Sequence, residues 1–86
     1  LDVTNYDGWI ELRKYVMEKY GRVDVLVNNA GGGVAIKSIL EQTKEDIDAS
    51  LALNLTSAIY GSKIFAEVLC KQGRGTIINV ASVCAL

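Results

Sequence analysis

The chain has 86 residues, enough for one small domain, and a domain of that size buries only about 60% of the surface of its unfolded chain. Half of the residues are hydrophobic, 22% are charged and the formal net charge is −1, which is typical of an ordinary globular protein and excludes a disordered or membrane-spanning chain. The sequence has no histidine and only two cysteines, so Ser-His-Asp and Cys-His catalysis are excluded and neither a zinc site nor a disulfide framework is indicated.

The first predicted element is an amphipathic helix that ends at Gly21. Thr4, Asn5 and Asp7 can each cap its N-terminus. Apolar side chains then recur at spacings of three and four residues, which is the helical period. They are Trp9, Leu12, Val16 and Tyr20.

Two short apolar segments predict strands. Residues 23–28 and 76–82 are β-branched and apolar on both faces, as expected of strands inside a parallel sheet that is covered on both sides. The glycine run at 31–33 ends the first strand. We therefore expect both strands to be buried.

A second helix is predicted between the strands, from Thr43 to residue 69 or 70. Thr43 followed by Asp46 resembles a capping box with Asp in place of Glu, and Gly73 ends the helix. An apolar set with helical spacing runs along it: Ile47, Leu51, Leu55 and Ile59.

The order strand end, helix, strand, long helix, strand predicts part of a doubly wound α/β sheet, a β-α-β-α-β unit. In such sheets ligands bind beyond the carboxyl ends of the strands. Asp2, residues 28–31 and Ser82 should therefore gather along one edge. The chain lacks an initiator Met and stops just after a strand, so we expect residues 1–86 to be one partial domain, truncated at both ends.

Four segments carry a resemblance to a known family. In chain order they are Leu1-Asp2-Val3, Asn28-Asn29-Ala30-Gly31, Leu53-Asn54-Leu55 and the run from Gly75 to Ser82. They resemble the short-chain dehydrogenases/reductases, among them the 3-oxoacyl-ACP reductases and the polyol and sugar dehydrogenases. The resemblance covers essentially the whole chain. It implies a Rossmann-type NAD(P)-binding domain and hydride transfer between nicotinamide and a carbonyl or secondary alcohol.

The resemblance also implies cofactor contacts. Asp2 and Val3 match the family's adenine-contacting pair, although Asp2 could instead cap the following helix. Asn29 matches the position beside the cofactor, and Ala30 and Gly31 have almost no side chain, so a ribose can approach the backbone. The cofactor is NAD or NADP. No metal is expected.

Two residues match catalytic positions of the family. Asn54 would hold a water that links the catalytic Lys to solvent, the alternative being a satisfied buried amide. Ser82 would polarise the substrate oxygen, the alternative being an ordinary serine at a strand end. Asn28 is expected to have a structural role, tying its strand to the neighbouring one.

Two family motifs are missing from these 86 residues: the glycine-rich T-G-x-x-x-G-x-G turn and the Y-x-x-x-K pair. Tyr15 and Lys19 match Y-x-x-x-K literally, but they precede the NNAG segment and so lie on the wrong side of it. We expect the fragment alone to be inactive. Two alternatives stay open, a non-catalytic dinucleotide-binding or scaffold relative and an inactive truncated product.

The remaining expectations concern partners and surroundings. Lys and Arg are spread along the chain without a cluster, which argues against nucleic acid, and no stretch is apolar enough to span a membrane. The partner should be a small carbonyl or alcohol substrate. Small and apolar residues lie around more of the 43–70 helix than one core face needs. The resemblance implies that this helix packs against its copy in a second subunit, so we expect a homodimer or homotetramer. The location should be cytoplasmic, with Cys70 and Cys84 buried or half-buried.

Overall fold

The computed structural model describes residues 1–31 and 39–80. Its elements are, in chain order, α1 (Tyr6–Tyr20), β1 (Val25–Asn28), the 3-10 helix η1 (Ile39–Glu41), α2 (Lys44–Leu51), the π-helical segment η2 (Ala52–Thr56), α3 (Ser57–Gln72) and β2 (Thr76–Asn79). This order confirms the predicted α/β fragment, although both strands are shorter than expected. The first strand of the predicted β-α-β-α-β unit is not formed, because residues 1–3 precede α1 without pairing as a strand.

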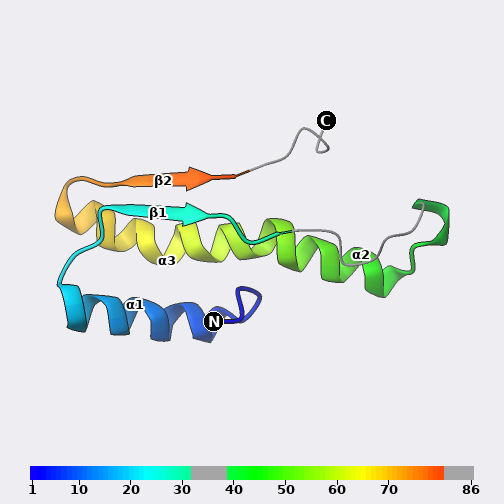
Figure 1. The fold of residues 1–86 in the computed structure, drawn as a ribbon, viewed down its shortest axis with the longest axis horizontal. Helices are drawn as coiled ribbons and strands as arrows, with labels where there is room; N and C mark the ends of the chain where they lie inside the picture. The colour runs from blue at the N-terminus through cyan, green and yellow to red at the C-terminus, as the bar shows by residue number, and fades with distance from the viewer. Residues whose placement is uncertain (32–38, 81–86) are drawn as a thin grey trace.

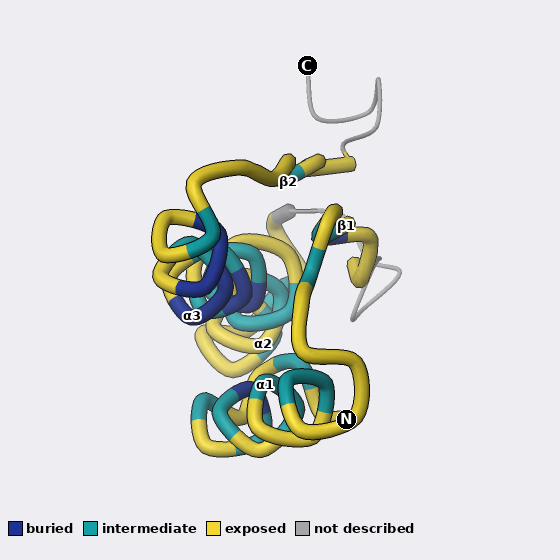
Figure 2. The backbone as a smooth tube through the Cα atoms, turned by 90° about the vertical axis from the view of Figure 1, so that its left-hand side faces the viewer, coloured by how far each residue is buried: buried dark blue, intermediate teal, exposed yellow. Residues whose placement is uncertain are grey.

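The two strands form a parallel pair. Val25 lies opposite Thr76 and Asn28 opposite Asn79. The unit α2, η2 and α3 is the crossover between them (Figure 1), and α3 packs against both strands and against α1. Figure 2 shows the strands together above the helices. Because the strands pair in parallel, the carboxyl ends of β1 and β2 meet at one edge.

The helix ends follow the local sequence signals. Of the three candidate caps for α1, Asn5 does the capping, with its side chain accepting a 3.3 Å hydrogen bond from a first-turn backbone N–H. Thr43 and Asp46 form the predicted reciprocal capping box, with bonds of 3.1 and 3.0 Å. Gly21 and Gly73 end α1 and α3 at φ values of 74° and 80°, which only glycine adopts readily.

The core lies between α1 and α3. Trp9, Ile64 and Phe65 are its buried centre, and the rings of Trp9 and Phe65 meet edge to face at 6.2 Å, a favoured aromatic geometry. The indole N–H of Trp9 donates to the Val3 carbonyl at 2.9 Å. The first turns of α1 are thereby fixed against the segment that precedes them.

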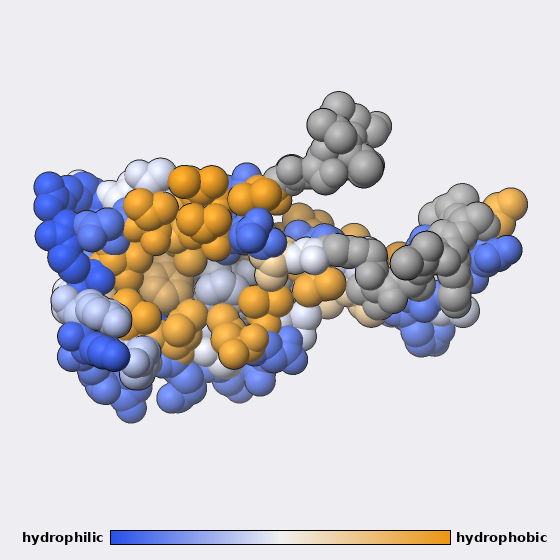
Figure 3. All heavy atoms as spheres, viewed as in Figure 1, coloured by the Kyte–Doolittle hydropathy of each residue, from blue (hydrophilic) through white to orange (hydrophobic). Residues whose placement is uncertain are grey.

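The expectation that both strands are buried was wrong. The exposed fractions of Val25, Val27 and Val80 are 51%, 50% and 55%. Within the described part of the chain, helices cover one face of the strand pair and leave the other bare, and Figure 3 shows apolar residues gathered over this region. The apolar pattern was read correctly, but a strand is buried on both faces only where two helical layers are present.

The long helix also differs from its prediction. It is interrupted by η2, and the predicted apolar set faces solvent, with exposed fractions of 41% for Ile47 and 54% for Ile59. Its buried face is built from other residues, which are Ser57, Gly61, Ile64, Phe65, Val68 and Leu69. Cys70 is exposed, so its predicted burial was wrong, and Cys84 lies outside the described residues.

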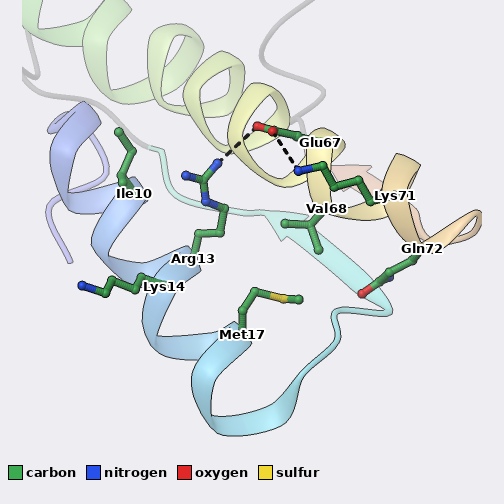
Figure 4. Close-up of a pocket in the computed structure, with 8 residues that line it drawn as sticks. All are labelled: Ile10, Arg13, Lys14, Met17, Glu67, Val68, Lys71 and Gln72. Carbon is green, nitrogen blue, oxygen red and sulfur yellow. Dashed lines mark hydrogen bonds and ion pairs between the residues drawn. The ribbon is translucent and has the colours of Figure 1, made fainter.

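Polar side chains tie α3 to its neighbours. Gln72 donates to the Val23 carbonyl at 2.6 Å and accepts from the Val23 N–H at 2.9 Å, as a strand partner would. Glu67 contacts Arg13 of α1 and Lys71 of its own helix at 3.4 and 3.3 Å (Figure 4). These exposed ion pairs add little stability, so the Gln72 bonds are the firmer link.

The predicted structural role of Asn28, which is to tie its strand to the neighbouring strand, is confirmed. Its exposed fraction is 9%, and its Nδ2 donates to Asn79 Oδ1 at 2.8 Å and to Ser62 Oγ at 3.2 Å. Its Oδ1 has no hydrogen-bond partner within the described residues, and a Cβ on Gly61 would lie 2.6 Å from this oxygen. One amide thus joins the ends of both strands to α3.

We predict that Asn28→Asp lowers the free energy of unfolding of the parent protein by at least about 2 kcal/mol at neutral pH, because both donated hydrogen bonds are lost and a carboxylate faces Asn79 Oδ1. Burial raises the pKa of the introduced carboxyl above its ordinary value of about 3.9. The loss should therefore be smallest below about pH 4 and should grow as the pH rises toward the raised pKa. Urea unfolding at acidic and neutral pH measures this.

Asn5→Asp is the matched control for this substitution. Asn5 is exposed, and Asp caps a helix as well as Asn does, so the free energy of unfolding should hardly change. An equal loss in both variants, or a loss from Asn28→Asp that does not depend on pH, would contradict the assigned role of Asn28.

Candidate functional site

The candidate site lies at the carboxyl edge of the strand pair. A groove of about 640 Å³ is lined there by polar residues, which are Asn28 at the end of β1, Asn79 at the end of β2 and Asn54 of η2, and by apolar ones that include Ala30, Leu55 and Ile59. Parallel strands place their carboxyl ends together, and the crossover brings η2 back to the same edge. Polar groups far apart in the sequence thus meet in one place.

Three of the predicted cofactor residues share a smaller cavity beside this groove. Val3, Asn29 and Ala30 line a space of about 50 Å³, together with Trp9 and Ser57. Asn29 and Ala30 are exposed and Val3 is half-buried. The N-terminal segment and the NNAG segment are therefore adjacent, as the expected roles require.

Asp2 is exposed and organises the turn before α1. Its Oδ1 accepts hydrogen bonds from the Thr4 hydroxyl at 2.7 Å and from the Thr4 N–H at 2.9 Å. These bonds, the hydroxyl's first, lower the pKa of the carboxyl, because they stabilise its charged form. The alternative in which Asp2 caps the helix is wrong, since Asn5 is the cap. Both bonds go to Oδ1, so Oδ2 can still accept from a ligand.

Gly31 and Asn54 are in close contact. A Cβ on Gly31 would lie 2.8 Å from Asn54 Oδ1, a separation that real Cβ atoms do not adopt. The Asn54 Nδ2 donates to the Ser50 carbonyl at 2.9 Å. In the alternative interpretation, Asn54 was a buried amide with its hydrogen bonds made. The hydrogen bond is present, but the residue is exposed, so the expected burial is wrong.

Asn54 lies in the middle of η2, a π-helical turn. Such turns are rare and are often found at functional sites. The N–H of Ser57 donates to the Ala52 carbonyl five residues back, and the Ser57 hydroxyl donates to the Leu53 carbonyl at 2.5 Å. The sequence reasoning missed both the π turn and Ser57, since a serine inside a helical pattern gives no distinct signal.

Other predicted features lie elsewhere. Tyr15 and Lys19 form a 3.1 Å hydrogen bond, but they belong to the end of α1 that leads into the amino end of β1, away from the NNAG segment. Ser82 lies outside the described residues. A second groove, of about 530 Å³ between α1 and α3, contains Arg13 and the Glu67 that pairs with it (Figure 4), and it contains none of the predicted site residues.

The described residues contain neither a membrane-spanning helix nor a cluster of metal-ligating side chains. Within residues 1–31 and 39–80, no helix combines the length and the apolarity that crossing a membrane requires. In the same part of the chain, no group of three or more Cys, Asp or Glu residues is placed to hold a metal ion.

Comparison with known proteins gives consistent matches. The chain is 40% identical to the 3-oxoacyl-[acyl-carrier-protein] reductase FabG of Thermotoga maritima, over 96% of this chain and 33% of that protein. It is 30% identical to NAD+-bound xylitol dehydrogenase, with a TM-score of 0.91 over 98% of this chain and 32% of the other. It is also 30% identical to ElxO with NADP bound, with a TM-score of 0.89 over 96% and 34% of the two chains.

The chain thus spans about a third of the length of the relatives it matches. The family model for short chain dehydrogenases matches residues 1–86, which is the whole sequence. The matched range includes the NNAG segment, Asn54 and Ser82. The chain belongs to the short-chain dehydrogenase family.

Proposed function

We propose that the protein containing this chain is an NAD(P)-dependent oxidoreductase that moves a hydride between nicotinamide and a carbonyl or secondary alcohol. The observation that carries the proposal is the meeting of the NNAG segment with Val3 and Asn54 at the carboxyl edge of the strands, in a chain of this family. Relatives with NADP and with NAD+ bound support a nicotinamide cofactor of either kind.

The residues at this edge suit a dinucleotide. Ala30 and Gly31 are small and exposed, so a ribose can approach their backbone. Asp2 keeps Oδ2 for a donor such as an exocyclic amine, beside the half-buried Val3. We therefore assign cofactor binding to Asp2, Val3, Asn29, Ala30 and Gly31, in one NAD(P)-binding domain to which residues 1–86 contribute.

The cofactor would supply or accept the hydride. Side chains of this chain would polarise the substrate oxygen and take part in the proton relay. Ser82 follows β2 closely, and we assign its hydroxyl to polarising the substrate oxygen. Asn54 would order the water of the proton relay. A 3-oxoacyl thioester and a polyol are the substrate classes to test first, because the relatives include a 3-oxoacyl reductase and a xylitol dehydrogenase.

We predict that Ser82→Ala in the parent protein lowers kcat by roughly 10²–10³-fold and that Asn54→Ala lowers it by about tenfold or more, while the affinity for NAD(P)H changes little in both. Stopped-flow or steady-state absorbance of NAD(P)H measures kcat, and fluorescence titration measures affinity. Glu45→Gln, on the exposed surface of α2, should leave both unchanged.

The same assays separate the competing functions. Binding of NAD(P)H without turnover of any carbonyl or alcohol would contradict the oxidoreductase and favour a non-catalytic dinucleotide-binding relative. Absence of both binding and turnover would favour an inactive truncated product. A kcat of Ser82→Ala equal to that of the wild type would contradict the role given to Ser82.

We also propose that the parent is a homodimer or homotetramer that pairs through the 43–70 helix. The exposed apolar stripe on α2, η2 and α3 supports this, with exposed fractions of 41% for Ile47, 51% for Leu51, 55% for Leu55 and 54% for Ile59. Contiguous exposed apolar side chains of this kind commonly mark protein interfaces. For the location we propose the cytoplasm, which cell fractionation tests.

We predict that Leu51→Asp shifts the parent toward monomer, because a charge would be buried without a partner in the interface. Leu51 is chosen because Leu55 and Ile59 also line the groove of the candidate site. Size-exclusion chromatography with light scattering measures the mass. Leu40→Asp is the control, since Leu40 is 94% exposed in η1 and lies off the stripe. A wild-type monomer, or an unchanged mass for Leu51→Asp, would contradict this interface.

A further inference from the structure

The π turn needs a group that satisfies the carbonyl left behind by its unusual bonding. In a regular α-helix the N–H of Ser57 would donate to the Leu53 carbonyl, four residues back. Here that N–H donates to Ala52, five residues back. The Leu53 carbonyl would therefore lose its ordinary partner, and an unpaired backbone carbonyl is unfavourable.

The side chain of Ser57 supplies the missing donor. Its hydroxyl donates to the Leu53 carbonyl at 2.5 Å, and the residue is 3% exposed, so water does not readily compete for this carbonyl. Serine hydroxyls that bond backward along a helix are known to bend it. Ser57 thus satisfies two successive carbonyls, one through its N–H and one through its hydroxyl.

We propose that Ser57 is a positioning residue whose buried hydroxyl holds the π turn and thereby places Asn54 in the site. Asn54 lies between the two ends of this turn, and its Oδ1 is against Gly31. Ser57 also lines the cavity that Val3, Asn29 and Ala30 share. The catalytic part of this inference rests on the proposed function, through the role of Asn54.

Ser57→Ala in the full-length protein removes only the hydroxyl. We expect the turn to relax toward α-helical bonding. We also expect kcat to fall by about tenfold, and by no more than in Asn54→Ala, because Ser57 acts through Asn54. KM and the affinity for NAD(P)H should stay unchanged, which a general loss of folding would not give. Ser57→Thr should keep kcat near that of the wild type, because a threonine hydroxyl can donate the same hydrogen bond to the Leu53 carbonyl.

Thr56→Val is the matched control. It removes the neighbouring hydroxyl, which caps nothing at the start of α3, and kcat should not change. A crystal structure of the Ser57→Ala protein gives a readout independent of activity. A retained π turn with unchanged kcat would overturn the proposal, and so would an equal loss of kcat in Thr56→Val. If the turn relaxes but the wild type transfers no hydride, the geometric role of Ser57 stands and the proposed function fails.

Discussion

Two parallel strands cannot be joined by a tight turn, because the chain must return to the end from which it started. Between Asn28 and Thr76 this return is made by α2, η2 and α3, and the pairing of β1 with β2 fixes where each of them lies. Asn28 reinforces the pairing at its carboxyl end by reaching both Asn79 and Ser62. The place of the core and of the candidate site both follow from this constraint.

The crossover formed by α2, η2 and α3 contributes both to the core and to the candidate site. Its second half, α3, provides the core through Ile64 and Phe65, which pack against Trp9 of α1. Its first half passes the carboxyl edge, where Asn54 meets Gly31. The π turn separates these halves, so the part that packs and the part that serves the site need not share one regular helical register.

Helix caps and glycine helix ends were predicted correctly from the sequence, because each depends on residues within a few positions of one another. Examples are the capping box of Thr43 and Asp46 and the glycine ends at Gly21 and Gly73. The choice among Thr4, Asn5 and Asp7 as the cap of α1 was not settled by sequence, since all three can accept the same bond. Asn5 caps because it stands directly before the first helical residue.

The sequence by itself determined the family, the order of elements and the residues that follow each strand. Tertiary structure decided which apolar side chains are buried. Periodicity shows that Ile47 and Ile59 share a helix face, but burial depends on whether a neighbouring element covers that face, and here none of the described elements buries it. The partners of Asn28 and the π turn at Ser57 were also decided only in three dimensions, because they depend on contacts and carbonyl bonding that no local pattern encodes.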